Sequence, residues 1–153
     1  MAQVRYDHRK GPGKGIEVPC AHSYFHRLGG GFVTIVSGNA TLTTQGDPVA
    51  GWVNAGRDAN SGLKDSVLVS AGKVFVITGL DDHFEIPVNE ASASLALTHV
   101  GQGADIIVAN ESTYLTKQYA KLGAAASPLV VTHVDVTNKT VHVRIKPAAY
   151  QPL

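Results

Sequence analysis

The sequence predicts an all-β protein with little helix, and three observations support this prediction. Its 153 residues include 19 Val and 11 Thr but only four Glu and one Met. β-Branched residues pack well in strands, whereas Glu and Met favour helices. The 16 Gly and seven Pro fall mostly between short Val-rich runs, where they indicate turns. Short strands separated by turns are typical of a β-sandwich or a small β-barrel.

The first thirty residues differ from the rest of the chain. Residues 1–30 contain five Lys or Arg and two acidic residues, and residues 31–153 contain eight basic and ten acidic residues. The GPGKG run at 11–15 and Pro19 disfavour both a helix and a central strand. We therefore predict an extended basic N-terminal arm over residues 1–30, attached to a β-barrel or β-sandwich body over residues 31–153.

Strands are predicted where an apolar run lies between turn residues. These runs are 32–36, 49–53, 66–69, 73–78, 84–88, 95–100 and 105–109. Pro87 indicates that its strand is at an edge or ends there, because proline lacks the N–H that a sheet needs. The polar stretch 54–64 and the small residues 123–128 are predicted loops. Residues 112–122 alone suggest a helical turn or two.

The clearest element is a hairpin near the end of the chain. The even positions from Val130 to Val136 are expected to form one apolar face. After the turn at 137–139, the pattern resumes with the odd positions from Val141 to Ile145. Alternation on both sides of a short turn that contains Asn predicts a hairpin with one buried face.

The histidines give no strong indication of a metal site. His22 and His26 are four residues apart, but no helical pattern surrounds them. In an extended chain this spacing places them about 13 Å apart, too far for one metal ion. We interpret His133, Asp135 and His142 as the outer, polar side of the predicted hairpin.

The densest acidic cluster is Asp81-Asp82-His83 with Glu85. Carboxylates so close together suit cation binding or acid–base chemistry. The flanking residues indicate a turn between strands, which Asp also favours. We therefore prefer a structural turn.

Other sequence features provide no basis for an enzyme or a bound cofactor. GPGKG lacks the spacing of a phosphate-binding loop, and no serine lies in a G-x-S-x-G motif. The single cysteine, Cys20, excludes an intrachain disulfide and a cysteine-based zinc site. A net charge of +1 gives no overall attraction to nucleic acid or to membranes. We predict no catalytic residues, no metal and no cofactor.

Several segments of the body have an order and spacing similar to those of a known family. They are Gly31–Val33, Pro48–Val53, Phe84–Asn89, Gly103–Val108 and the pair Val134–Val136 and Val141–Ile145. Across about residues 30–146 they resemble the small decoration (cement) proteins on the heads of tailed bacteriophages. In that family we expect an F-x-(I/L)-P-V-N-like strand, then a G-x-x-(A/C)-D-(I/L) segment, then a valine-rich hairpin. The N-terminal arm is a departure from this pattern.

The resemblance implies a β-barrel or β-tulip-like sandwich, commonly a homotrimer, on the outer surface of the virion capsid. It implies that the protein binds the major capsid protein and clamps neighbouring subunits against the pressure of packaged DNA. Neither nucleic acid nor a membrane is an expected partner. An arm with little apolar content can order on another protein, and acidic capsid surfaces would attract it. The predicted capsid-binding residues are Arg5, Tyr6, Arg9, Lys10, Lys14, Tyr24, Phe25 and Arg27.

Two other functions stay open. The first is a soluble β-sandwich that binds glycans or a host surface, with Trp52, Tyr114 and Tyr119 as stacking platforms. Trp52 also suits the core, which is the interpretation we prefer. The second is a trimeric nucleotide hydrolase of the dUTPase type, suggested by fragments at 55–58 and 61–63. In that family the motifs lie far apart in the chain, whereas here they are adjacent.

Overall fold

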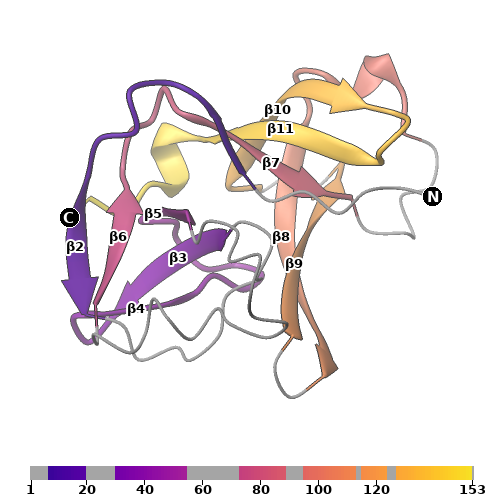
Figure 1. The fold of residues 1–153 in the computed structure, drawn as a ribbon. Helices are drawn as coiled ribbons and strands as arrows, with labels where there is room; N and C mark the ends of the chain where they lie inside the picture. The colour runs from indigo at the N-terminus through magenta and orange to yellow at the C-terminus, as the bar shows by residue number, and fades with distance from the viewer. Residues whose placement is uncertain are drawn as a thin grey trace, which may run out of the picture.

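The computed structural model confirms an all-β protein. It describes residues 7–19, 30–54, 73–88, 95–112, 115–123 and 127–152. In these residues the strands form two antiparallel sheets, shown in Figure 1. The sheets pack as a sandwich and do not close into the barrel that was one of the predicted forms. No helix in the described residues is long and apolar enough to cross a membrane.

The six-stranded sheet has the strand order β1-β7-β11-β10-β8-β9. Its strands are β1 (Asp7–Lys10), β7 (His83–Pro87), β8 (Gly103–Ser112), β9 (Leu115–Leu122), β10 (Leu129–Asp135) and β11 (Thr140–Ile145). The predicted hairpin is therefore confirmed as β10 and β11, with its turn at 136–139. Pro87 is the last residue of β7, so it limits the length of a central strand.

The five-stranded sheet has the order β2-β6-β5-β3-β4. Its strands are β2 (Gly15–Pro19), β3 (Gly30–Val36), β4 (Asn39–Leu42), β5 (Gly51–Asn54) and β6 (Lys73–Ile77). The tight turn between β3 and β4 places Ser37 and Gly38 at positive φ, as a two-residue hairpin turn requires. The predicted strand at 66–69 and most of the predicted loop at 54–64 lie outside the described residues.

An aromatic cluster joins the two sheets. Phe32 of β3 and Trp52 of β5 contact Phe84 of β7, and all three side chains are fully buried. The Trp52 and Phe84 rings stack at 5.0 Å, and Phe32 meets both rings edge-on. Trp52 is therefore a core residue, as preferred from the sequence, and its ring is not exposed for stacking on a glycan.

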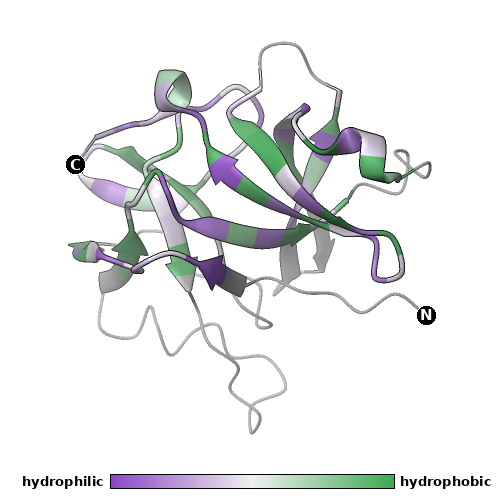
Figure 2. Ribbon diagram, turned by 90° about the horizontal axis from the view of Figure 1, so that it is seen from above, coloured by the Kyte–Doolittle hydropathy of each residue, from purple (hydrophilic) through white to green (hydrophobic). Residues whose placement is uncertain are grey.

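The five-stranded sheet is apolar on both faces. Phe32, Trp52 and Ile77 face the core between the sheets, whereas their chain neighbours Val33, Val53 and Val76 belong to a second buried cluster. This explains why these strands are continuous apolar runs rather than alternating patterns. Figure 2 shows the contrast, with green stretches in some strands and alternating green and purple in others.

Two predicted elements are wrong. The strand expected at 95–100 is instead a 3₁₀ turn, η2 (Leu97–His99), stabilised by the Ala96 N–H, which donates to His99 Nδ1 at 3.0 Å. The helical turns expected within 112–122 are strand β9, which pairs along its length with β8. The helical preference indicated by the spacing of a few apolar residues is smaller than the stabilisation that β9 gains by pairing with β8.

The predicted buried face of β10 is also wrong except at Val134, and Val136 lies in the turn and is 51% exposed. A β-bulge between Val131 and His133 shifts the register against β11. As a result Val131 and Val134 are both buried, whereas Val130 and Thr132 are only partly buried. An extra residue at a bulge reverses the inward and outward positions that follow it.

The described part of the N-terminal arm is paired with the body. Its residues 7–19 supply β1 and β2, which are edge strands of the two different sheets. In Figure 1 this indigo segment passes over the top of the molecule from one sheet to the other. Pro19 lies at the end of an edge strand, so the sequence correctly excluded a central one.

Candidate functional site

Three of the predicted capsid-binding residues lie in the described part of the chain. Lys10 ends β1 and Lys14 precedes β2, and both are exposed. Arg9 is an extra residue at a bulge in β1. The other five lie outside the described residues, namely Arg5, Tyr6, Tyr24, Phe25 and Arg27.

Arg9 is bound to a buried carboxylate of the body. Its Nε and Nη2 both donate to Glu85 Oε1, the first at 2.8 Å. Thr140 donates its hydroxyl to the other oxygen, Oε2. Glu85 is only 1% exposed. The hydrogen bonds from these donors therefore offset the free-energy cost of burying its charge. Arg9 thus fastens the N-terminal segment to the central strand β7.

A polar row crosses the outer face of the six-stranded sheet next to this ion pair. Glu85 lies opposite His142 of β11, and His142 lies opposite His133 of β10. The imidazole rings of His133 and His142 have centroids 4.7 Å apart. The predicted outer face of the hairpin is therefore confirmed for these two histidines. The pairing of His142 with Glu85 places Glu85 on the same face of the sheet.

A shallow cleft of about 370 Å³ lies on this face. We call it the histidine cleft; it is lined by Arg9, Lys10, His83, Thr132, His133 and His142. Four strands contribute, and Figure 1 shows β7, β10 and β11 together in this part of the sheet. His83 is fixed by a 2.9 Å contact between its Nδ1 and the Thr132 hydroxyl. The cleft therefore carries several nitrogen donors on a rigid sheet.

Two histidines of the cleft are held in the neutral form near pH 7. Burial lowers the pKa of His83 from 6.5, as do the nearby cations Lys10 and Arg144, whereas Asp82 and Asp81 oppose this shift.

Burial also lowers the pKa of His142, and His133, Arg9 and His83 add to the effect. Glu85 raises it, with Oε2 3.8 Å from His142 Nε2. Burial prevails here because Arg9 already balances the charge of Glu85.

The acidic cluster at 81–85 does not form a single acidic site. Asp81 is exposed, whereas Asp82 is fully buried and its Oδ1 accepts the N–H of Gly13 at 2.9 Å. Gly11 has φ +106°, and a Cβ there would lie 2.4 Å from Asp82 Oδ1. The glycines of the GPGKG run thus allow close approach to the turn, which supports the structural interpretation of Asp82.

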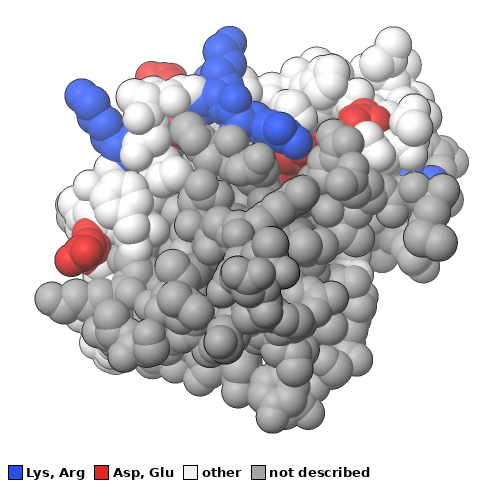
Figure 3. Space-filling model, viewed as in Figure 1, with Lys and Arg blue, Asp and Glu red and all other residues white. Residues whose placement is uncertain are grey.

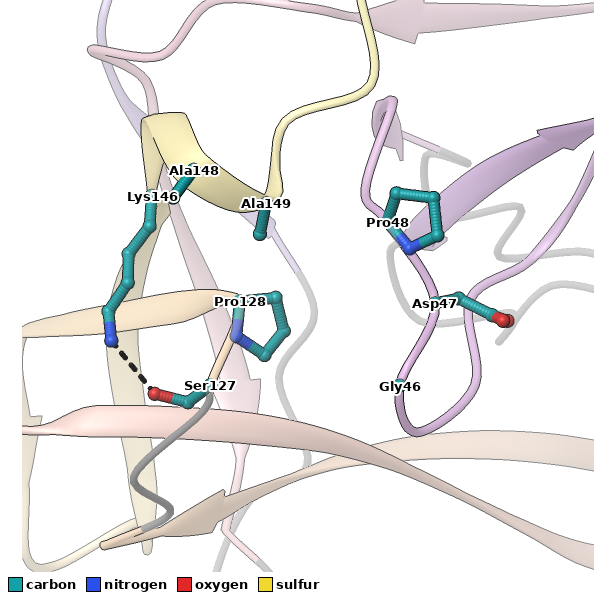
Figure 4. Close-up of a pocket in the computed structure, with 8 residues that line it drawn as sticks. All are labelled: Gly46, Asp47, Pro48, Ser127, Pro128, Lys146, Ala148 and Ala149. Carbon is teal, nitrogen blue, oxygen red and sulfur yellow. Dashed lines mark hydrogen bonds between the residues drawn. The ribbon is translucent and has the colours of Figure 1, made fainter.

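A second cavity, of about 500 Å³, lies beside the C-terminal turn η3 (Pro147–Ala149). Figure 4 shows Lys146 on one side of it, donating to the Ser127 hydroxyl at 2.9 Å. Asp47 lies on the other side and accepts hydrogen bonds from Thr44 of its own loop. The polar groups of this cavity are thus engaged locally, and its remaining lining is mainly Pro and Ala.

The other sequence candidates give no reactive centre in the described residues. No group of three or more His, Cys, Asp or Glu is placed to hold a metal ion in this part of the chain. Tyr119 is partly buried, and Tyr114, His22, His26 and the fragments at 55–58 and 61–63 lie outside the described residues.

The pairing of Arg9 with Glu85 could not be predicted from the sequence. The two residues are 76 positions apart, and no local pattern connects them. The one available signal was Glu85 in an apolar strand, because a charged residue in such a run needs a partner.

Comparison with protein-family models, with curated proteins and with solved structures gives no match.

Proposed function

We propose that this chain is a structural virion protein, a decoration protein that binds the outer surface of a tailed-phage capsid. It acts as a homotrimer and stabilises contacts between major capsid subunits against the pressure of packaged DNA. The segments that resemble the decoration family support this proposal, because they contribute strands β3, β5, β7, β8, β10 and β11. A rigid sandwich made from those strands suits a role in which binding, and not turnover, is the function.

The observation that carries the proposal is the position of the N-terminal segment. Residues 7–19 connect the edges of both sheets and leave Lys10 and Lys14 exposed. Because Arg9 fastens this segment to Glu85, the two lysines are held on a fixed support. Exposed cations on a fixed support favour fast and oriented association with an acidic protein.

Charge on the visible face of the molecule is consistent with a protein partner. On the face shown in Figure 3 the visible Lys and Arg side chains lie mainly along the upper edge, and Asp and Glu side chains lie near this edge and lower on the left. Affinity for nucleic acid rises with the number of phosphates neutralised, and a mixed surface neutralises few. Mixed charge instead suits a partner with a matching pattern.

The proposal is tested by sedimentation with capsid shells of the phage whose genome encodes the chain. We expect the protein to co-sediment with the shells and Lys10→Glu/Lys14→Glu to weaken binding at least tenfold, since each reversal turns an attraction into a repulsion. Lys121→Glu reverses an exposed charge on β9 and is the matched control. Failure of the unaltered protein to bind, or an equal loss in the control, would contradict the proposal.

Deletion of the N-terminal segment is a less informative test. Removal of residues 1–28 takes away β1 and β2 and exposes the edges of both sheets. It also leaves the buried carboxylate of Glu85 without Arg9. Loss of binding after such a deletion would combine the effects of a missing contact and a damaged body.

A further inference from the structure

We propose that strand β1 is a pH-dependent strap, which is docked on β7 at neutral pH and released on mild acidification. Release ends at Gly11, so β2 and the rest of the sandwich stay in place. The trigger is an exchange of partners at Glu85, where the protonated imidazole of His142 replaces the guanidinium of Arg9. This inference goes beyond the proposed capsid function and does not depend on it.

In the described residues β1 pairs with a single strand. It is the edge strand of the six-stranded sheet, and a bulge at Arg9 interrupts its register with β7. Arg9 adds the ion pair with the buried carboxylate of Glu85. A short edge strand of this kind lies at the low end of local stability, so it can open while the sandwich stays folded.

The residues that follow β1 provide a hinge and a firm end point. Gly11 and Gly13 have φ +106° and +65°, which glycine adopts freely. The Gly13 N–H donates to Asp82, and the Lys14 carbonyl accepts the N–H of Thr78 at 3.0 Å. β2 then pairs with β6 along all five of its residues. These contacts do not involve β1, so they hold the rest of the segment in place when β1 leaves.

Two cations are placed to compete for the carboxylate of Glu85. Arg9 Nε donates to Oε1 at 2.8 Å, and the Thr140 hydroxyl donates to Oε2. His142 Nε2 lies 3.8 Å from Oε2. A neutral imidazole brings no charge there, whereas the protonated ring brings an N–H donor and a positive charge. The buried carboxylate then keeps a cation when Arg9 withdraws, which reduces the cost of breaking its ion pair.

Each of two histidines in the cleft has a cation of β1 beside it. The titratable and charged groups that face His142 are Glu85 of β7, Arg9 of β1, His133 of β10 and His83 of β7. Those that face His83 are Lys10 of β1, Arg144 of β11, and Asp82 and Asp81 of the turn between β6 and β7. Only the two β1 cations leave with the strand. Protonation of the histidines therefore repels β1, whereas the groups on the body remain beside them in both states.

Proton binding and release of β1 are linked in sign. Burial lowers the pKa of both His83 and His142 from 6.5, and Lys10 and Arg9 respectively add to these shifts. Departure of β1 removes these cations and part of the lining of the cleft, so both pKa values rise toward 6.5. The state with the higher pKa binds protons first. The released state therefore gains population as the pH falls below about 6.5, and docking is complete above it.

The test is amide hydrogen exchange of the ¹⁵N-labelled full chain at pH 7.5 and pH 5.5, with rates corrected for intrinsic exchange. We expect the opening of residues 7–10 to increase at least about threefold at pH 5.5, because each histidine contributes up to about tenfold over this range. At pH 5.5 these amides should open at least about tenfold more often than those of β2. Their exchange should not respond to about 1 M urea, as local opening exposes little surface.

The side chain of Arg9 gives a second readout, which is specific for the exchange of partners. Its Nε–H donates to Glu85 in the docked state. We expect exchange of this proton with water to accelerate over the same pH range in which the imidazole of His142 titrates. Both signals are recorded by NMR on the same sample.

Histidine variants identify the trigger. His83→Gln/His142→Gln stays neutral at both positions, so the opening of β1 should change less than about twofold between the two pH values. His142→Gln alone should reduce the effect and uncouple the Arg9 signal. His133→Gln is the matched control, because it removes an exposed imidazole of the same cleft that stays on the body in both states. It should keep the full increase in opening.

Three results would overturn the inference. One is equal opening of β1 at pH 7.5 and pH 5.5 in the unaltered protein. Another is the full increase in His83→Gln/His142→Gln, which would assign the effect to groups other than these imidazoles. The third is loss of protection in β1 and β2 together, which would show that β1 is not a separate unit.

Discussion

Glu85 shows how a single residue connects the N-terminal segment to the body. It lies in the central strand β7 with its carboxylate buried, and Arg9 reaches it from an edge strand. A buried carboxylate without its cation is costly, so the pair acts as a unit in which each residue requires the other. The side chain of Arg9 is 34% exposed, which moderates the energy of the pair.

Replacement of Arg9 should therefore destabilise the protein more than a change at the neighbouring residue. We expect Arg9→Ala to lower the free energy of unfolding by about 1–3 kcal/mol, because it leaves Glu85 buried with fewer donors. Arg9→Ala combined with Glu85→Gln should cost less than the sum of the single changes. Urea unfolding measures both effects. Lys10→Ala serves as the control, with an expected change within about 0.5 kcal/mol.

Stability should also depend on pH through His83 and His142. The pKa of each is lowered in the folded protein, so the unfolded chain binds more protons than the folded one just below pH 6.5. Stability from these groups is therefore complete above about pH 6.5 and is lost as the pH falls toward their folded pKa values.

We expect the urea midpoint to fall between pH 7.5 and pH 5.5, and less steeply in His83→Gln/His142→Gln. Titration of the imidazole protons by NMR gives the direct check. A pKa of 6.5 or higher for both histidines in the folded protein would contradict this prediction.

At the scale of single elements, β9 illustrates a contact that no local pattern indicates. Gln118 on this strand is buried, and its side-chain amide bonds both backbone groups of Phe32. Its Nε2 also donates to the carbonyl of Thr43 at 3.0 Å. One side chain of the six-stranded sheet thus completes the hydrogen bonding of β3 in the other sheet.

Substitution of Gln118 should weaken the sandwich even when its volume is kept. We expect Gln118→Met to cost about 2–4 kcal/mol, because the buried Phe32 N–H and Thr43 carbonyl lose the amide, although the Phe32 carbonyl keeps the N–H of Thr43. Lys121→Ala, on the exposed side of the same strand, should change stability by less than about 0.5 kcal/mol. Thermal and urea unfolding of the two variants provide the comparison. Equal stability of both would show that the amide contributes nothing.

The elements differ in how well the sequence predicts them. The β10–β11 hairpin could be predicted because alternation and turn residues are local signals. The strand nature of β9 and the bulge in β10 could not, because both depend on pairing with distant strands. The 3₁₀ turn at Leu97–His99 was missed for a different reason, since a histidine side chain replaces a backbone partner there.

At the scale of the whole molecule, composition predicted the all-β class but not the division into two sheets. The short apolar strands carry no information on which sheet they join, and Phe32, Trp52 and Phe84 meet only after both sheets form. The candidate site was likewise only partly predictable from the sequence. Exposed Lys10 and Lys14 were predictable as charges, whereas the histidine cleft requires four strands to be side by side.

The decisive measurement is electron imaging of capsids that lack the protein, before and after the purified chain is added. We expect new density on the outside of the shell at three-fold and quasi-three-fold positions, with residues 7–19 facing the capsid. Shells that remain bare at saturating protein, or density in which residues 7–19 point away from the capsid, would refute the proposed decoration function.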